Sequence, residues 1–290
     1  MENTKKDMKR KLCVLISVSM LFIFTLTACS SNQKQDENKK SEASAGNEKV
    51  RIVLDWTPNT NHTGLYVAQS KGYFREQGLD VEIIQPPEGG AETLVGGGGA
   101  EFGISFQDTL SPNYASENQI PVTAVAAIIQ HNTSGIISLK DKGIDTPAKM
   151  AGHSYATWDL PIEKAIIKKI VEDDGGKFDD IKLIPSTVTD VVTALQTDVD
   201  AVWVYYAWDG IATKVKNVDT NFLNFADYGT ELDYYNPVII VNNDYAKNNP
   251  ETVKKALKAI QQGYQFAIDN PEEAAQILLD AAPELDPSLV

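Results

Sequence analysis

The sequence predicts an α/β fold of two lobes, each a mostly parallel sheet flanked by helices. From Val50 onward, short apolar runs typical of buried strands alternate with longer segments that have helical spacing. Repeated strand, helix and strand units of this length favour a parallel sheet covered by helices on both faces. The body of the chain, roughly 240 residues, exceeds the usual size of one domain, so two lobes fit it better.

The order of the predicted elements supports this fold. Residues 50–54 predict a buried strand, residues 64–77 a helix that ends near Gly78, and the β-branched run 122–129 another strand. Residues 249–269 have the apolar spacing of an amphipathic helix. The remaining predicted strands are 79–84, 101–105, 154–157, 181–184, 201–204, 222–225 and 236–241, and the remaining predicted helices are 91–95, 161–173, 189–196, 208–216 and 271–282.

Residues 1–28 have the pattern of a lipoprotein signal peptide. A basic segment ends at Lys11, residues 12–26 are apolar but too short for a membrane span, and Leu26-Thr27-Ala28-Cys29 looks like a bacterial lipobox. The lipobox predicts cleavage before Cys29 and lipidation of its thiol. A plain secretory signal with an incidental cysteine is the alternative.

Lipidation at Cys29 would hold the mature chain at the cell membrane, lipid-anchored on the extracytoplasmic face. Residues 29–49 then comprise the lipidated cysteine and a disordered tether. They contain no large apolar residue, so they cannot bury enough surface to fold.

Composition excludes several classes of function. The chain's cysteines are Cys13 and Cys29, and the first is lost with the signal peptide, so the mature body has no disulfide, cysteine metal site or catalytic cysteine. The net charge of −14 argues against nucleic acid as a partner. The three histidines have no metal-ligand spacing. We therefore expect neither a metal nor a cofactor.

The arginine content restricts the ligand. The mature chain has two arginines, Arg51 and Arg75, and neither lies in a stretch that looks like a pocket. Phosphate, sulfate and carboxylate groups are usually held by the bidentate guanidinium fork. A small ligand of this protein is therefore expected to be neutral or cationic.

Polar and aromatic side chains gather directly after several predicted strands. In open α/β sheets, ligands bind beyond the carboxyl ends of the strands. The combination of flat rings, amides and acids suits a planar heteroaromatic ligand that is stacked between rings and hydrogen-bonded along its edge. The candidate ligand-binding residues are Asp55, Trp56, Asn59, His62, Ser105, Gln107, Tyr205, Tyr206, Trp208 and Asp209.

Several of these residues have a second interpretation. Asp55 is also placed to cap the loop amides of residues 57–59. His62 has three candidate roles, as a ligand contact, a metal ligand or a residue at a helix start. The rings that follow the predicted strand 201–204 have the alternative of packing between that strand and the next helix.

The first of these motifs carries a family resemblance. The run Leu54-Asp55-Trp56-Thr57-Pro58-Asn59-Thr60-Asn61-His62-Thr63-Gly64, followed by Gly72-Tyr73-Phe74 and Gly78-Leu79-Asp80-Val81, resembles the start of the thiamine-pyrimidine family. That family joins exported binding proteins of ABC importers to fungal enzymes that make the pyrimidine precursor. The likeness covers nearly all of residues 50–282.

The resemblance implies a two-lobed periplasmic-binding-protein fold with two hinge crossovers. The crossovers would fall near residues 134–140 and 228–241. Lobe 1 would then comprise residues 50–140 and 228–290, and lobe 2 residues 141–227.

The resemblance also implies a function. The protein would be the solute-binding lipoprotein of an ABC importer, with the importer permease as its partner, and would capture a thiamine-precursor pyrimidine of the formylaminopyrimidine or hydroxymethylpyrimidine type. We expect a monomer. Asp209 stands where binding proteins of the family often carry glutamate, which leaves riboflavin or another flat heteroaromatic molecule as the alternative ligand.

An enzyme of the family's fungal branch is disfavoured. Those synthases place a lysine for pyridoxal phosphate and a substrate histidine four residues apart after the third strand, and they need a cysteine-rich CCCFC run. The matching places in this chain hold Ile104, Asp108 and the stretch VWVYY. We therefore expect a binding protein and not an enzyme.

Overall fold

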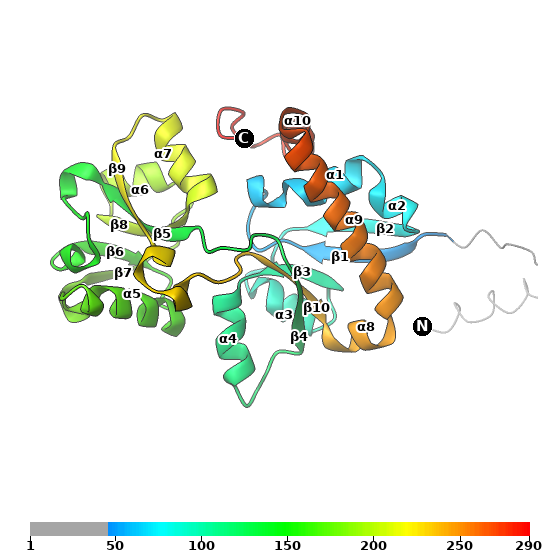
Figure 1. Ribbon diagram of the computed structural model, residues 1–290, viewed down its shortest axis with the longest axis horizontal. Helices are drawn as coiled ribbons and strands as arrows, with labels where there is room; N and C mark the ends of the chain where they lie inside the picture. Colours follow the sequence, from blue (N-terminus) through cyan, green and yellow to red (C-terminus); the bar gives the residue numbers. More distant parts are fainter. Residues whose placement is uncertain (1–45) are drawn as a thin grey trace, which may run out of the picture. The chain divides into compact units, whose positions relative to one another are not determined.

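The computed structural model describes residues 46–290, and Gly46–Val290 forms one compact unit built on two five-stranded sheets (Figure 1). The predicted signal peptide over residues 1–28, the lipidation site Cys29 and the tether up to residue 45 lie outside the described residues. Within residues 46–290, no helix is both long enough and apolar enough to cross a membrane.

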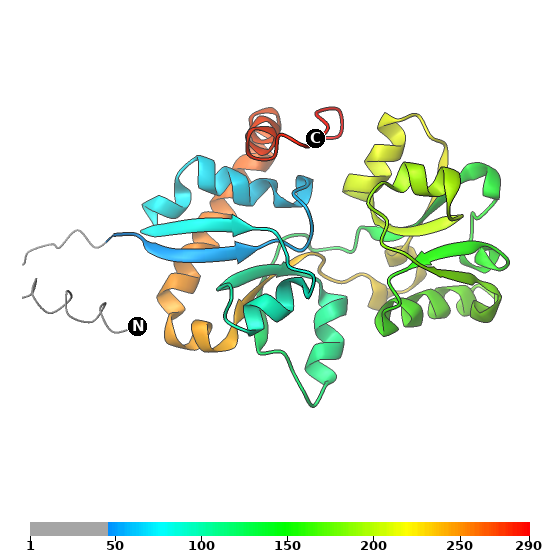
Figure 2. The same ribbon diagram turned by 180° about the vertical axis from the view of Figure 1, so that it is seen from behind.

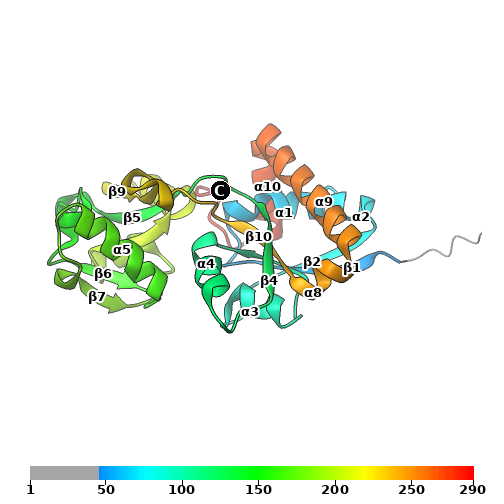
Figure 3. The same cartoon turned by 60° about the horizontal axis from the view of Figure 1, so that its bottom comes forward.

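The first lobe contains one sheet with helices on both of its faces. Its elements are β1 (Glu48–Val53), α1 (Thr63–Ser70), α2 (Tyr73–Glu76), β2 (Leu79–Ile84), α3 (Gly90–Gly96), β3 (Phe102–Ser105), α4 (Gln107–Ala115), β4 (Val122–Ala127), β10 (Val238–Asn242), α8 (Asn243–Asn248), α9 (Pro250–Asp269) and α10 (Pro271–Ala281). The strand order is β2-β1-β3-β10-β4. Helices α1, α2 and α9 bury Leu65, Phe74 and Ile260 on one face, and α3 and α4 bury Val95 and Leu110 on the other (Figure 3).

The second lobe repeats this arrangement. Its elements are β5 (Ser134–Leu139), β6 (Ser154–Thr157), α5 (Pro161–Asp173), β7 (Lys182–Pro185), α6 (Val191–Thr197), β8 (Ala201–Tyr205), the π-helix η5 (Tyr206–Gly210), α7 (Ile211–Val215) and β9 (Thr220–Asn224). The strand order is β7-β6-β8-β5-β9. Helices α5 and α6 cover opposite faces of this sheet (Figure 2). Helix α5 packs Ile167 and Ile170 against Trp203, and α6 packs Leu195 against Val202.

The predicted two-lobed α/β fold is confirmed, and both sheets are mixed. In the first sheet, β1 pairs in parallel with β2 and β3, whereas β10 runs antiparallel to β3 and β4. In the second sheet, β6 pairs in parallel with β7 and β8, whereas β5 runs antiparallel to β8 and β9. The antiparallel strand of each sheet is the one that enters directly from the other lobe.

The predicted lobe boundaries need correction. Residues 134–140 were assigned to lobe 1, but Ser134–Leu139 forms β5 of the second sheet. The strand contains the polar residues Ser134 and Ser138, which are buried and hydrogen-bonded inside the lobe, so its sequence lacks a continuous apolar run. Leu232, also assigned to lobe 1, packs in the second core. The crossovers are therefore residues 128–133 and 233–237.

Several element boundaries also differ from the sequence predictions, and two of the differences have a clear physical reason. Strand β1 begins at Glu48, inside the predicted tether, because Tyr245 and Thr252 donate hydrogen bonds to the Glu48 carboxyl group. The helix predicted over residues 64–77 is broken, since Gly72 adopts the left-handed conformation with φ 80° between α1 and α2. The helix predicted over residues 208–216 begins as the π-helix η5.

Helices α1 and α9 approach each other closely through two glycines. A Cβ atom on Gly263 would lie 2.0 Å from the Gly64 carbonyl oxygen, and one on Gly64 would lie 2.3 Å from the Tyr264 ring. No side chain fits at either position without moving a helix. The contact sets the position of α1, which follows directly on the loop after β1.

Replacing Gly263 by alanine is expected to lower the free energy of unfolding by about 1–3 kcal/mol, because the added methyl group overlaps the backbone of α1. Equilibrium urea denaturation measures the loss. Gly46→Ala is the matched control, since a Cβ at Gly46 meets no atom within 4 Å. Equal stability of Gly263→Ala and the wild type would show that the helices do not pack this closely.

Candidate functional site

The loop after β1 is organised by the side chain of Asn59. Asn59 caps the short 3₁₀ helix η1 (Thr60–His62), accepting a hydrogen bond from the Asn61 N–H at 2.9 Å. Its Nδ2 atom donates to the Thr57 carbonyl oxygen at 3.1 Å. Asn59 is only 5% exposed, so its polar atoms serve the loop. This use differs from the predicted ligand contact.

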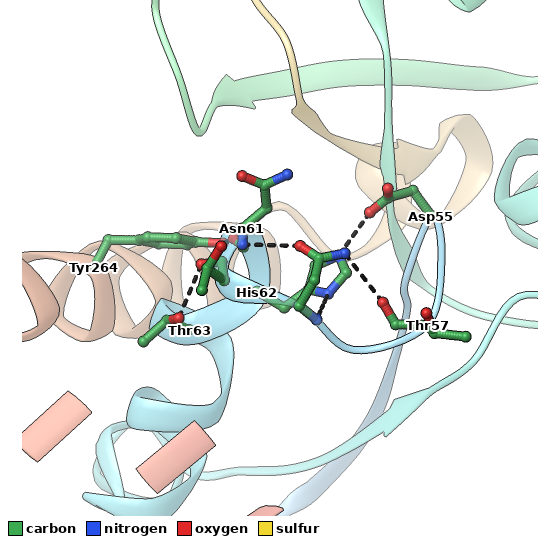
Figure 4. Close-up of polar contacts among 8 residues, drawn as sticks. Asp55, Thr57, Asn61, His62, Thr63 and Tyr264 are labelled. Atoms are coloured by element: carbon green, nitrogen blue, oxygen red, sulfur yellow. Dashed lines mark hydrogen bonds and ion pairs between the residues drawn. The ribbon is translucent and has the colours of Figure 1, made fainter. Parts of the chain in front are cut away.

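His62 connects this cap to the acid at the start of the loop (Figure 4). The Asn59 N–H donates to Nδ1 of His62 at 3.2 Å, and Nε2 of His62 lies 2.7 Å from Oδ1 of Asp55. Because Nδ1 accepts, Nε2 carries the proton and donates it to Asp55. His62 is fully buried with both ring nitrogens bonded, so it is a positioning residue at the helix start and not the predicted ligand contact.

Trp56 is the exposed aromatic residue of the loop, whereas the Asp55 side chain is only 9% exposed. One oxygen of Asp55 is held by His62, and Trp56 is a large aromatic side chain that remains 41% exposed. The hydroxyl group of Tyr264 on α9 donates to the Asn61 carbonyl oxygen at 2.7 Å and supports the loop from behind (Figure 4). The loop thus presents an exposed indole beside an acid that is largely buried and bonded to His62.

The residues after β3 are mostly engaged within the protein. Ser105 is fully buried and donates a hydrogen bond to Glu92, so the structure does not present it to a ligand as predicted. Oε1 of Gln107 accepts from the Tyr235 N–H at 3.1 Å, which attaches α4 to the second crossover. Phe106, which was not predicted, stacks on Tyr205 of the second lobe with ring centroids 5.3 Å apart and planes inclined by 15°.

The aromatic residues after β8 divide between packing and the site. Tyr205 reaches the first lobe through the stack with Phe106. Tyr206 instead packs against Phe222 inside the second lobe at 4.7 Å, as in the packing alternative. Trp208 is partly buried in η5, and the Thr60 hydroxyl group lies 3.5 Å from the Ala207 carbonyl oxygen, which connects η5 to the loop after β1.

A small pocket of about 20 Å³ in the second lobe places an acid near the exposed Trp158 and the core residue Trp203. It is lined by Asp209 together with Trp158, Ser186 and Trp203. Burial raises the pKa of Asp209 to about 6. Trp158 and Ser186 were missed by the sequence analysis, although each directly follows a strand, β6 and β7 respectively. A search for polar and aromatic residues directly after each strand, which gave the other candidates, also selects these two.

Glu163 holds the loop that carries Trp158. Its buried carboxyl oxygens accept hydrogen bonds from the Tyr155 hydroxyl group at 2.7 Å and the Thr157 hydroxyl group at 2.9 Å. The same oxygens accept from the N–H groups of Trp158 at 3.2 Å and Leu160 at 3.3 Å. Glu163 therefore positions the loop after β6, as His62 positions the loop after β1.

The candidate site thus consists of Asp55 and Trp56 on the first lobe and Tyr205, Trp158 and Asp209 on the second. These groups can stack on a flat ring and accept hydrogen bonds from its edge. Among residues 46–290, no group of three or more acidic, histidine or cysteine side chains is arranged to hold a metal ion.

The fold is that of the periplasmic binding proteins, as a comparison with solved structures shows. The alkanesulfonate-binding protein SsuA from Xanthomonas axonopodis pv. citri superposes with a TM-score of 0.65 at 14% identity, covering 85% of this chain and 83% of that one. SsuA from Escherichia coli superposes with a TM-score of 0.64 at 18% identity, covering 83% and 81%. At these identities the likeness shows the fold alone.

The chain belongs to the NMT1/THI5-like family, whose family model matches residues 59–274. A formylaminopyrimidine-binding protein of Halalkalibacterium halodurans is 29% identical over 279 residues, which cover 95% of this chain and 81% of that protein. A 4-amino-5-hydroxymethyl-2-methylpyrimidine phosphate synthase of Saccharomyces cerevisiae is 27% identical over 259 residues, 83% of this chain and 74% of that protein. The resemblance carried by the first motif is confirmed.

His62→Ala is expected to lower the free energy of unfolding by about 3 kcal/mol, because it leaves a cavity and removes the partners of Asn59 and Asp55. Urea denaturation measures the change. His131→Ala is the control: that side chain is 76% exposed and pairs only at the surface with Asp233, so its loss should cost less than about 1 kcal/mol. Similar losses for both variants would contradict the positioning role of His62.

Asp209→Asn is expected to raise the melting temperature of the ligand-free protein at pH 7 by roughly 2–4 °C. The folded pKa of about 6 lies above the ordinary value of 3.8, so ionised Asp209 destabilises the folded state above about pH 6. This penalty disappears as the pH falls from about 6 to 4, and the gain of the variant should disappear with it. Thermal melts across this range measure both.

Asp233→Asn provides a control of opposite sign. Hydrogen bonds from His131 and from the Asn132 N–H lower the pKa of Asp233, so its ionised form stabilises the folded state. The Asp233→Asn variant should therefore be less stable than the wild type at pH 7, and the difference should shrink in acid. The same sign for both variants would overturn the assignment.

Proposed function

We propose that the protein is the solute-binding component of an ABC importer and captures a thiamine-precursor aminopyrimidine of the formylaminopyrimidine or hydroxymethylpyrimidine type. The observation that carries the proposal is the set of side chains at the strand ends: the exposed indoles of Trp56 and Trp158, and Asp209 near Trp158. Indole rings stack on a pyrimidine, and a carboxyl group accepts a hydrogen bond from its exocyclic amine. The relative named as a formylaminopyrimidine-binding protein supports this ligand class.

The positions of the arginines support a ligand without negative charge. Arg51 is paired with Glu101 at 3.0 Å, and Glu101 lies just before β3, at the end of the sheet opposite to the candidate site. Arg75 lies in α2, on the outer layer of the first lobe. No arginine within residues 46–290 therefore follows the carboxyl end of a strand, where an anion would need it.

Capture would work through differential affinity for two arrangements of the lobes. Asp55 and Trp56 belong to the first lobe, and Trp158 and Asp209 to the second. A ligand that contacts both sets at once stabilises the arrangement in which both reach it. The likeness to periplasmic binding proteins supports this solute-binding mode.

We propose binding without turnover, even though relatives include a pyrimidine phosphate synthase. The positions that match the synthase lysine and histidine hold Ile104 and Asp108, and residues 46–290 contain no cysteine. We further propose that a lipid on Cys29 tethers the protein as a monomer to the outer face of the cell membrane, where it delivers its ligand to the importer permease.

Isothermal titration calorimetry of the purified protein with the formylaminopyrimidine, hydroxymethylpyrimidine and thiamine is expected to show binding of at least one pyrimidine. Trp56→Ala should weaken it by about 1–3 kcal/mol, because one stacking wall is lost. Tyr114→Ala removes an aromatic side chain of similar exposure, 44% against 41%, in the last turn of α4 and should leave the affinity unchanged.

Two results would contradict the proposal. The first is the absence of heat for all three ligands. The second is a purified protein that is yellow and carries riboflavin, because the flavin would then be the captured molecule.

A further inference from the structure

The side-chain amide of Asn236 is buried, and the Tyr205 hydroxyl group lies near it without completing a hydrogen bond of ordinary geometry. Asn236 is 0% exposed, and among residues 46–290 neither its Oδ1 nor its Nδ2 atom makes a hydrogen bond of ordinary geometry. Its backbone N–H is satisfied by the Ile129 carbonyl oxygen at 3.2 Å. Buried polar side chains in native proteins are almost always paired, so an orphaned amide requires a physical explanation.

The crossovers do not need this amide for their own structure. Asn132, in the first crossover, is also buried, but both of its polar atoms are bonded: it donates to the Leu232 carbonyl oxygen at 2.9 Å and accepts from the Ser134 N–H at 3.0 Å and hydroxyl group at 2.7 Å. The structural role of a buried asparagine at the hinge is therefore filled by Asn132. Asn236 has the same amide group, but no protein atom of the crossovers bonds it.

Other polar groups with unused capacity surround Asn236. The Tyr234 hydroxyl group is buried and makes no hydrogen bond of ordinary geometry within the described part of the chain, although the Asp108 carboxyl group and the Asn132 amide lie near it. Burial raises the pKa of Asp108 to about 6, and Tyr234 and Glu92 lie close enough to influence that carboxyl group. Tyr205 adjoins both Asp108 and Asn236, and burial raises its pKa well above the usual value.

These groups come from three segments that meet at the candidate site. Asp108 lies in the first turn of α4, Tyr205 ends β8, and Tyr234 and Asn236 lie in the second crossover. The stacked rings of Phe106 and Tyr205 connect the same two lobes. The cluster therefore adjoins the residues proposed to bind the ligand.

We propose that the side-chain amide of Asn236, together with the Tyr234 hydroxyl group and the Asp108 carboxyl group, forms a polar wall that recognises the edge of the bound heterocycle. The inference rests on the proposed function for the identity of that heterocycle. It assigns to the hinge a specificity-determining role that none of the strand-end residues supplies.

The chemistry of the wall defines the ligand edge that it fits. A primary amide presents one donor and one acceptor side by side, which matches a ring nitrogen adjacent to an exocyclic amine, as in a 4-aminopyrimidine. The second proton of the same amine remains for the carboxyl group of Asp209, and the carboxyl group of Asp108 can accept from a hydroxyl or N–H group next to it on the ligand's edge. The wall therefore selects a ring with an amidine-like edge over one whose edge only accepts hydrogen bonds.

Asn236→Ala and Tyr234→Phe are compared with Asn132→Ala by thermal melting without ligand and by calorimetric titration with 4-amino-5-hydroxymethyl-2-methylpyrimidine. Removing an unpartnered buried group should leave the ligand-free melting temperature unchanged or raise it. The affinity for the pyrimidine should fall roughly tenfold or more in Asn236→Ala and severalfold in Tyr234→Phe. Asn132→Ala should show the reverse pattern, a lower melting temperature with little further effect on binding.

Each outcome decides between the alternatives. A fall in the ligand-free melting temperature of Asn236→Ala with unchanged affinity would show that the amide serves the fold, which overturns the inference. If the wild type binds no pyrimidine but binds riboflavin, and Asn236→Ala weakens that binding, the amide contacts the ligand, but both the amidine-like edge and the proposed ligand are wrong. A wild type that binds neither ligand overturns both.

Discussion

The candidate site depends on two loops that are held from beneath by buried polar side chains. His62 positions Asp55 after β1, and Glu163 positions Trp158 after β6. Both loops follow parallel strands, so their outward residues collect at the carboxyl edges of the two sheets. Because each supporting residue is bonded only within its own lobe, a loop keeps its shape whatever the other lobe does.

The groups proposed to contact the ligand share an energetic property. Burial raises the pKa of both Asp108 and Asp209 to about 6, and the Asn236 amide is buried without a hydrogen bond of ordinary geometry. Each of these groups destabilises the ligand-free protein and would gain a hydrogen-bond partner in a complex with an aminopyrimidine. The free-energy penalty of these groups in the ligand-free protein is relieved when the ligand binds, and this relief adds to the affinity. Variants that remove the penalty should therefore be more stable without ligand and bind more weakly.

Much of the fold could be predicted because strong periodicity specifies it locally. The strand Ser154–Thr157 and the helix Pro161–Asp173 have the predicted bounds. Strand β5 could not be predicted, because its buried serines are satisfied by partners that only the folded chain brings near. The candidate site was predicted in part. The residue types after the predicted strands singled out Trp56 and Asp209, but the sequence could not show that the polar atoms of Asn59 and His62 are already bonded within the loop. Nor does sequence reveal that the Asn236 amide is orphaned, since burial there depends on both crossovers.

A crystal structure of the protein with bound 4-amino-5-hydroxymethyl-2-methylpyrimidine tests the central claim most directly. The account predicts that the ring lies between the two lobes, stacked on at least one indole, Trp56 or Trp158. Its exocyclic amine should lie within hydrogen-bonding distance of a carboxyl group, that of Asp209 or Asp108. A pyrimidine bound on the outer surface of either lobe, or an anion held in its place between the lobes, would contradict the account.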